Sequence, residues 1–540
     1  MSACGPPSPT ARPTAHSFAF TELTPVSFLR RAAAVFAGRT AVADAEERFT
    51  HAQLWERSQR LAGLLADRGV RPGDRVGLLA PNSRQALEAH YGVPLAGAVL
   101  VALNTRLSAA ETGHILEHSG VRAVLVDSEL RPLLTAAARD LPVPPEVIAS
   151  DDYEKLLAAA APHRVEAADE RGLLSINYTS GTTGRPKGVM YHHRGAYLNA
   201  LAMAYHTAMD TSSRYLWTLP MFHTNGWCFP WAVTAAGAVH HTLRKAAPEA
   251  IWRALRTDGI THFCAAPTVL ALLADHPDAA PLPTRVRVYS GGAPPRPALL
   301  ARLDGLGFDV THFYGLTETF GNALLCVGQP EWAALDPDAR TRAALRQGVA
   351  NIVGEPARVV APDGRETPAD GRSVGEILLR GNNVTLGYYR DPEASARASL
   401  GEWFRTGDLA VRHPDGYVEI RDRAKDVIIS GGENIASVEV ENTLTAHPGV
   451  AEAAVVAGPH PVWGEVPVAF VARRPGATVG EAELIDFVRS RLARFKAPRR
   501  VVFGPLPTTS TGKLRKNLLR ERAASTLEQT DDLPRPGGVP

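Results

Sequence analysis

The chain has 540 residues, 45% of them hydrophobic and 21% charged, and it carries a formal net charge of +2. This length predicts two or more domains, and the composition is ordinary for a soluble globular protein. The near-neutral charge argues against nucleic acid or an anionic membrane as the main partner. The four cysteines are scattered without metal-ligand spacing, which predicts reduced thiols in a cytoplasmic protein. The sequence has no apolar run long enough for a membrane span, and a peripheral membrane contact stays open.

The predicted elements begin after residues 1–17, whose Pro, Ser and Gly content predicts a disordered tail rather than a targeting sequence. In the first half of the chain, short apolar strands alternate with amphipathic helices. Strands are predicted at 75–80, 98–102 and 121–127, and helices at 83–97 and 108–118. Ser108 followed by Glu111 predicts a capping box at the start of the second of these helices. The alternation predicts parallel sheets covered by helices, and it resumes from Thr261.

The second half of the chain predicts two smaller units. Residues 354–421 form a β-rich unit with strands at 375–380 and 416–421. Residues 422–520 form a C-terminal lid with strands at 453–457 and 466–471 and helices at 437–446 and 481–492. Residues 521–540 predict a second disordered tail. The predicted fold class is α/β: a large body of parallel-rich sheets flanked by helices, spanning 18–421 with its β-rich unit, and a mobile α+β lid.

The string YTSGTTGRPKG at residues 178–188 lies between a predicted strand at 173–178 and a predicted helix at 195–206. Its three glycines let the backbone turn tightly and approach a ligand closely. Successive N–H groups and four hydroxyls supply donors, and Lys187 supplies positive charge, as a polyphosphate requires. The spacing differs from that of the common P-loop. Together, strand, loop, lysine and helix favour a polyphosphate cradle over a plain surface loop.

This string resembles the signature of the adenylate-forming superfamily, which includes acyl-CoA synthetases, peptide-synthetase adenylation domains and beetle luciferases. The resemblance covers roughly residues 25–520, and further motifs follow in the family's order. They are GGAP at 291–294, HFYGLTET at 312–319, WFRTGD at 403–408 and PTTSTGKLRK at 507–516. The resemblance implies an AMP-forming acid–thiol ligase that activates a carboxylic acid as acyl-AMP, releases pyrophosphate and transfers the acyl group to coenzyme A. It implies ATP, Mg²⁺ and coenzyme A as cofactors or co-substrates.

The residue types of the second motif suit a nucleotide. Tyr314 offers a flat face to adenine, Thr317 can bond a phosphate, and Glu318 can hold Mg²⁺ through oxygen. The resemblance adds Asp408 as the ribose ligand and Thr182 beside Glu318 at the metal. The full set of implied ATP contacts is Thr179, Ser180, Gly181, Thr182, Thr183, Gly184, Lys187, Gly291, Gly292, Ala293, Pro294, Tyr314, Gly315, Thr317, Asp408, Arg423 and Lys513.

Three parts of the predicted lid take roles from the resemblance. Lys513 matches the catalytic lysine, whose ammonium stabilises the charge that develops when a carboxylate attacks the α-phosphate, by roughly 3–4 kcal/mol. Lys425 occupies the hinge between body and lid. The string SGGENI at 430–435 resembles the loop that lines the pantetheine tunnel of CoA ligases, through Gly431, Gly432 and Glu433. Because one lid cannot present both faces at once, a rotation between the half-reactions is expected.

The acid-binding segment is expected at residues 219–238, which combine four aromatics with small residues. A cavity lined by these aromatic and small side chains would fit an alkyl or aryl acid. The pattern MFHxNxW resembles medium- and long-chain fatty acyl-CoA synthetases, which places His223, Asn225 and Trp227 in the acyl pocket, with Trp227 as its gate. The predicted catalytic set is Lys513, Glu318, Thr317 and His223.

Several alternatives stay open at this stage. The substrate could be another small carboxylic acid, aryl or methylthio-alkanoic, or the acceptor could be a carrier protein loaded by an acyl-AMP ligase. A different class is a catalytically inactive nucleotide-binding regulator, although the intact Glu318, Asp408 and Lys513 argue against it. The partners expected are the acid, ATP and coenzyme A, without nucleic acid, and a homodimer stays open.

Overall fold

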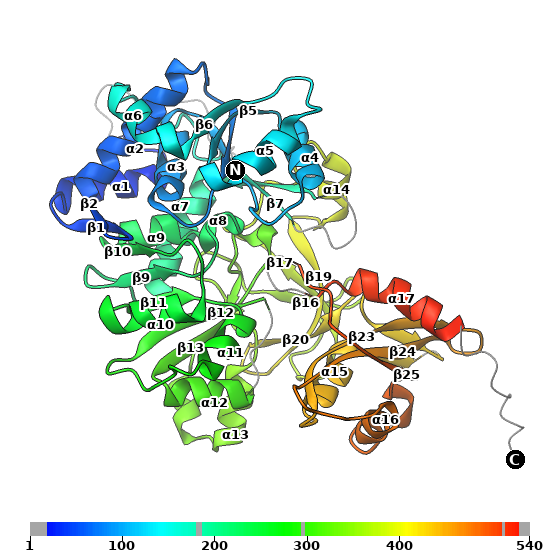
Figure 1. Cartoon of the computed structure of the whole chain (residues 1–540). Coiled ribbons are helices and arrows are strands. Elements are labelled where there is room, and N and C mark those ends of the chain that lie inside the picture. The colour runs from blue at the N-terminus through cyan, green and yellow to red at the C-terminus, as the bar shows by residue number, and fades with distance from the viewer. Residues whose placement is uncertain (1–18, 180–185, 293–296, 432, 510–513, 529–540) are drawn as a thin grey trace, which may run out of the picture.

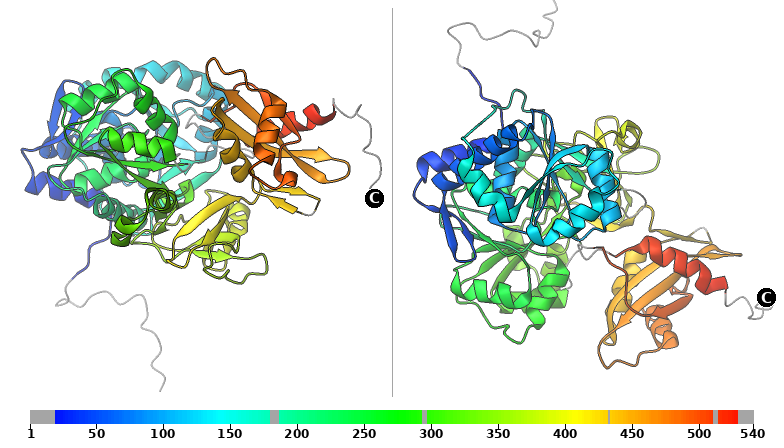
Figure 2. Two further views of the ribbon diagram at one scale, coloured as in Figure 1. Left: turned by 90° about the horizontal axis from the view of Figure 1, so that it is seen from below. Right: turned by 45° about the horizontal axis from the view of Figure 1, so that its top comes forward.

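The computed structural model describes residues 19–179, 186–292, 297–431, 433–509 and 514–528 (Figure 1). The views in Figures 1 and 2 agree that the C-terminal lid, drawn in orange and red, projects from one side of a larger body. The predicted α/β fold class, with a large body and a smaller C-terminal domain, agrees with this arrangement. None of the helices in the described residues is long and apolar enough to cross a membrane.

The first body sheet has six strands among the described residues, in the order β6-β5-β3-β4-β7-β8, and is parallel except for the pair β7 and β8. The predicted capping box is confirmed, since the Ser108 hydroxyl and the Glu111 carboxylate each accept a hydrogen bond from the other's backbone N–H. The strands are β3 (Arg75–Leu79), β4 (Val99–Ala102), β5 (Val121–Val126), β6 (Glu146–Ala149), β7 (Leu173–Tyr178) and β8 (Gly188–His192). The helices are α1 (Val26–Val35), α2 (His51–Asp67), α3 (Arg84–Leu95), α4 (Ala109–Ser119), α5 (Arg131–Ala138), α6 (Ser150–Ala159) and α7 (His193–His206), with η1 (Ser128–Leu130).

The second body sheet has nine strands among the described residues, in the order β15-β14-β13-β12-β11-β9-β10-β1-β2, and is parallel from β13 to β1. One hydrophobic cluster contains residues of both body sheets, such as Leu78 and Tyr289, so the two sheets share a core. The strands are β1 (Thr40–Asp44), β2 (Glu47–Thr50), β9 (Arg214–Trp217), β10 (Val239–Thr242), β11 (His262–Cys264), β12 (Val286–Gly291), β13 (Phe308–Tyr314), β14 (Leu324–Leu325) and β15 (Val349–Ala350). The helices are α8 (Thr224–Trp227), α9 (Phe229–Ala235), α10 (Pro248–Thr257), α11 (Pro267–Asp275), α12 (Pro297–Gly305) and α13 (Pro337–Ala344), with η2 (Thr317–Thr319) and η3 (Pro330–Ala334).

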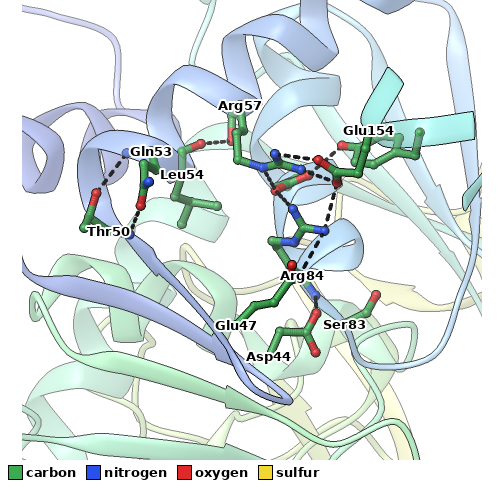
Figure 3. A network of polar contacts seen from close by, with 12 residues as sticks. Asp44, Glu47, Thr50, Gln53, Leu54, Arg57, Ser83, Arg84 and Glu154 are labelled. Carbon is green, nitrogen blue, oxygen red and sulfur yellow. Dashed lines mark hydrogen bonds and ion pairs between the residues drawn. The ribbon is translucent and has the colours of Figure 1, made fainter. Parts of the chain in front are cut away.

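A buried ion network ties α2, α3 and α6 together at the N-terminal end of the body (Figure 3). The Glu88 carboxylate is fully buried and accepts hydrogen bonds from Arg57 Nε at 2.6 Å and from the Tyr153 hydroxyl at 2.7 Å. Arg57 and Arg84 both also pair with Glu154, at 2.7 and 2.8 Å. Since the buried Glu88 carboxylate is paired with Arg57, it is not left as an uncompensated charge between the helices.

The β-rich unit is an antiparallel sheet of β16 (Arg358–Val360), β17 (Gly375–Leu379), β18 (Ser399–Leu400), β19 (Trp403–Arg412) and β20 (Val418–Arg423), with α14 (Pro392–Arg397). The lid sheet contains β21 (Ile428–Ser430), β22 (Glu433–Ile435), β23 (Val450–His460), β24 (Gly464–Arg473) and β25 (Arg500–Phe503), packed with α15 (Ser437–Thr445), α16 (Glu481–Arg489), η4 (Arg494–Lys496) and α17 (Lys516–Glu528).

Two predictions differ from the structure. A tail is predicted from residue 521, but the described chain is helical there: α17 continues to Glu528 and packs Leu519, Ala523 and Leu527 onto β23 and β24 at helical spacing. The loop at 178–188 was expected to lead from a strand into a helix. Instead it leads into β8, whose five residues pair antiparallel with β7 before α7 begins, so the loop caps a β-hairpin.

Candidate active site

The predicted phosphate loop lies at the tip of the β7–β8 hairpin. Its base is closed twice: Thr179 N donates to Lys187 O at 3.0 Å, and Lys187 N donates to Thr179 Oγ1 at 3.2 Å. Lys187 itself is exposed beyond this closure. The predicted contacts Ser180, Gly181, Thr182, Thr183 and Gly184 lie outside the described residues.

Gly291 of the GGAP string and Tyr314 of the HFYGLTET string lie at one edge of the nine-stranded sheet. Gly291 pairs with Phe313 in the parallel register of β12 and β13, so Gly291 and Tyr314 lie at neighbouring carboxyl ends of strands. Ligands of open α/β sheets bind outside such ends. Ala293 and Pro294 lie outside the described residues.

The Asp408 carboxylate joins β13 to the β-rich unit. Its Oδ2 accepts a hydrogen bond from the Tyr314 hydroxyl at 2.6 Å, and its Oδ1 pairs with Arg423 Nε at 3.1 Å. Burial, followed by the charge of Asp408, raises the pKa of Tyr314 well above its ordinary value, so the hydroxyl stays a donor. The structure therefore brings together three residues predicted at the adenosine. A carboxylate has about four lone-pair sites, so Asp408 retains acceptor capacity for ribose hydroxyls.

Gly315 follows Tyr314 and lies against the chain itself. A Cβ at Gly315 would lie 2.0 Å from the carbonyl oxygen of Gly321. Only glycine lets these two backbone segments approach so closely. This close approach of the two backbone segments fixes the turn that carries Thr317 and Glu318.

Glu318 and Lys187 meet at a tyrosine that the sequence did not single out. The Tyr388 hydroxyl donates to Glu318 Oε1 at 2.7 Å, and Lys187 Nζ lies 4.8 Å from the centre of the Tyr388 ring. The predicted metal ligand and the predicted phosphate ligand therefore lie on two sides of one side chain. In nucleotide sites Mg²⁺ is bound by one or two carboxylates together with substrate phosphates, and the Glu318 carboxylate beside the phosphate loop fits that donor set.

The Trp227 indole lies between Gly291, which begins the GGAP string, and Gly321, just after the HFYGLTET string. An ideal Cβ at Gly291 would lie 2.7 Å from Cη2 of Trp227, and one at Gly321 would lie 2.7 Å from its Cδ1. Trp227 is 8% exposed. Trp227, which is predicted in the acyl pocket, thus lies directly against Gly291, which is predicted in the adenine loop. This is the position expected for an acid that must meet the α-phosphate.

Trp227 belongs to a left-handed turn rather than a regular helix. Residues 224–228 all have positive φ, from 48° at Asn225 to 65° at Cys228, and only one of the five is glycine. Each such non-glycine residue costs about 1–2 kcal/mol, so the turn needs outside support. Asn225 provides this support, since its side-chain amide donates a hydrogen bond to Ser175 Oγ at 2.7 Å. The Asn225 side chain is fully buried. Asn225 anchors the turn to β7, and His223 is half-buried directly before it.

The predicted coenzyme A loop lies at the start of the lid. Gly431 has φ +58°, and a Cβ there would lie 2.6 Å from Cε3 of Trp463. Gly431 N also donates to Trp463 O at 2.9 Å, and the indole is 55% exposed. Glu433 is exposed in β22, and Gly432 lies outside the described residues.

The predicted hinge lies in the turn between β20 and β21. Arg520 of α17 donates to the Lys425 carbonyl at 3.0 Å and pairs with Asp426, so the last helix of the lid is tied to the hinge. Burial, followed by the charge of Arg423, lowers the pKa of Lys425. Lys513 lies outside the described residues. The two ends of its loop are joined by a bridge between Thr508 and Leu514.

Residues 29–389 match the model of the AMP-binding enzyme family, and residues 439–513 match that of the AMP-binding enzyme C-terminal domain. The chain belongs to the AMP-binding enzyme family. This AMP-binding enzyme is 42% identical to an acetate/butyrate–CoA ligase of Arabidopsis thaliana, over 93% of this chain and 95% of the relative. It is also 42% identical to a 2-methylpropanoate–CoA ligase of Humulus lupulus, with the same coverage.

Among solved structures, the AMP-binding enzyme resembles ATP-bound MatB from Rhodopseudomonas palustris, with a TM-score of 0.82 and 29% identity over 92% of this chain and 98% of that chain. The predicted superfamily and the α/β fold with its C-terminal domain are therefore confirmed. The predicted enzyme class, an AMP-forming acid–thiol ligase, is confirmed as well.

Sequence reasoning missed two residues of the site. Tyr388 stands in the string GYY at 387–389, far from the motifs, and Trp463 stands before β24. Each is a single aromatic without a distinguishing pattern around it. Only their contacts, with Glu318 and with Gly431, single them out.

Proposed function

We propose that this AMP-binding enzyme activates a short-chain carboxylic acid with ATP and transfers the acyl group to coenzyme A. The observation that carries the proposal is the position of Trp227, whose indole fills the space between Gly291 and Gly321 beside the nucleotide edge. A bulky side chain there leaves room for a small acid. Two relatives, each 42% identical to this chain, are named as CoA ligases of acetate or butyrate and of 2-methylpropanoate. Both observations favour the small-acid alternative over the medium- or long-chain acid expected from the MFHxNxW pattern.

In the proposed first half-reaction, the acid carboxylate attacks the α-phosphate and pyrophosphate leaves. Tyr314 stacks on adenine, and Asp408 accepts the ribose hydroxyls while Arg423 neutralises its charge. Lys187 binds the departing phosphates, and Lys513 stabilises the charge that develops on the α-phosphate. Mg²⁺, held by Glu318 and Thr182, would supply further neutralisation of the phosphates.

In the proposed second half-reaction, the lid turns about Lys425 and presents the Gly431 loop to the body. The coenzyme A thiol attacks the acyl carbonyl of acyl-AMP, and AMP leaves with the bonding pair. Gly431 leaves room beside the backbone for the thin pantetheine arm. No cysteine of the protein takes part in this scheme.

The proposal is tested by measuring acid-dependent pyrophosphate release and CoA-thioester formation with straight-chain acids from acetate to octanoate, beside 2-methylpropanoate, benzoate and 3-methylthiopropanoate. We expect the highest kcat/KM between acetate and butyrate. A maximum at octanoate or beyond would overturn the short-chain assignment. Pyrophosphate release without thioester would point to a carrier-protein acceptor, and no acid-dependent release would indicate a regulator. The cytoplasmic location stays a prediction, since the Arabidopsis thaliana relative is named as peroxisomal.

A further inference from the structure

Residues 385–389 form a strap that crosses the strand following the phosphate loop. Tyr389 N donates to Gly188 O at 2.7 Å, and Tyr388 forms an antiparallel bridge with Val189. The strap is therefore fixed by backbone pairing to β8, and its geometry does not depend on the side chain at 388.

The same strap fixes the predicted metal ligand through its backbone. Thr385 N donates to the carbonyl oxygen of Glu318 at 2.8 Å, so the main chain of Glu318 is held independently of its carboxylate. The carboxylate is held by the Tyr388 hydroxyl at 2.7 Å. Tyr388 is 9% exposed and Glu318 is half-buried, so water competes little with this hydrogen bond.

Lys187 Nζ lies over the same ring, 4.8 Å from its centre. A cation at this distance is attracted to the ring face. Tyr388 thus contacts both charged groups predicted at the phosphates, an anion through its hydroxyl and a cation through its face.

We propose that Tyr388 is a positioning residue of the adenylation step, whose hydroxyl orients the Glu318 carboxylate toward the Mg²⁺ of MgATP. This inference rests on the proposed function. Carboxylates that bind metals are commonly held by such an outer hydrogen bond, and its loss typically lowers metal affinity or activity about 10–100-fold. The ring makes a separate contribution by placing Lys187.

The test uses Tyr388→Phe, which keeps the ring and the backbone pairing and removes only the hydroxyl. Tyr389→Phe is the matched control, since Tyr389 neighbours it on the same strap and its ring contacts His118 instead. ATP affinity is measured by calorimetry in Mg²⁺ and in EDTA, and both half-reactions are assayed separately. Thermal unfolding reports whether each variant is folded.

For Tyr388→Phe we expect ATP affinity in Mg²⁺ to fall about tenfold, while affinity in EDTA stays at the wild-type value. Adenylation should need more Mg²⁺ for half-maximal rate, and thioester formation from supplied acyl-AMP should stay unchanged. Tyr388→Leu, which also removes the ring beneath Lys187, should weaken ATP binding in EDTA as well.

The proposal is overturned if Tyr388→Phe and Tyr389→Phe show the same Mg²⁺ dependence, or if both half-reactions fall equally in Tyr388→Phe. A wild-type enzyme without acid-dependent pyrophosphate release would instead overturn the proposed function. The two failures are therefore distinguishable.

Discussion

Gly291 and Trp227 compete for one space: the Trp227 indole lies where a side chain on Gly291 would extend, 2.7 Å from an ideal Cβ. Gly291 ends β12 in the predicted adenine loop, and Trp227 belongs to the predicted acyl pocket. The predicted adenine loop and the predicted acyl pocket therefore share a wall. A substitution at either Gly291 or Trp227 should therefore change the position of the other residue.

Trp227→Ala should shift the acid preference toward longer chains. Removing a nearly buried indole opens a cavity, and each methylene accommodated in such a pocket changes kcat/KM by roughly tenfold or more. We expect the ratio of kcat/KM for octanoate over butyrate to rise at least about tenfold. The measurement is CoA-thioester formation across the straight-chain series, with Trp332→Ala, far along the chain beside Tyr417, as the control. An unchanged ratio would contradict the role of Trp227.

Gly291→Ala tests the shared wall directly. The added methyl group must displace Trp227, so acid-dependent pyrophosphate release should fall about tenfold or more with butyrate. Combining Gly291→Ala with Trp227→Ala should restore much of the loss, because the 2.7 Å contact with the indole is then absent and only the 3.1 Å contact with the Phe313 carbonyl oxygen remains. The double-mutant cycle gives the coupling free energy, and additive effects would show that the two residues act separately.

Lys513→Ala should separate the half-reactions. The ammonium is proposed to stabilise charge on the α-phosphate, so acyl-AMP formation should fall a few hundredfold, corresponding to roughly 3–4 kcal/mol. Thioester formation from supplied acyl-AMP should be largely spared. Lys155→Ala, on the exposed face of α6, is a matched control that should behave as wild type. Equal losses in both half-reactions would refute the division of labour.

Gly431→Ala should have the opposite effect to Lys513→Ala, because it should slow thioester formation and spare acyl-AMP formation. The position has φ +58°, and a Cβ would lie 2.6 Å from Trp463, so alanine strains the turn and pushes the indole aside. We expect the KM for coenzyme A to rise and thioester formation to slow about tenfold, with acid-dependent pyrophosphate release unchanged. Gly476→Ala, in another lid turn with φ +79°, controls for backbone strain alone. A similar effect of both variants would deny the Gly431 loop a specific role.

Acid should destabilise the protein through its buried histidines. His240 accepts a hydrogen bond from Trp217 Nε1 at 3.1 Å, so its Nδ1 has no room for a proton. Burial lowers the pKa of His240, and it lowers the pKa of His51, His90 and His241 to about 4 from 6.5.

Between about pH 6.5 and pH 4 the unfolded chain therefore binds more protons than the folded protein. The free energy of unfolding is unaffected above this window and falls as the pH drops through it, by up to roughly 1.4 kcal/mol per pH unit for each histidine. Urea unfolding at a series of pH values measures the slope. A flat profile through the window would show that these histidines do not titrate on unfolding.

The sequence by itself determined the family, the α/β fold class and the enzyme class. The apolar pattern of residues 173–178 was enough to predict β7, because a strand depends on local hydrophobicity. The pair Ser108 and Glu111 was enough to predict the start of α4, because a capping box is made by local side-chain hydrogen bonds. The strings around Tyr178, Tyr314, Asp408 and Lys513 were recognisable because their chemistry resides in contiguous residues.

Tertiary structure alone decided which distant residues meet. Neither the sequence pattern nor composition could place Tyr388 against Glu318, 70 positions apart, since that contact depends on how the strap pairs with β8. The same holds for the left-handed turn of Trp227, which local propensity disfavours and which Asn225 supports by a hydrogen bond to β7. Contacts that override local preference are set by packing between distant parts of the chain, and they shape the predicted acid pocket of this AMP-binding enzyme.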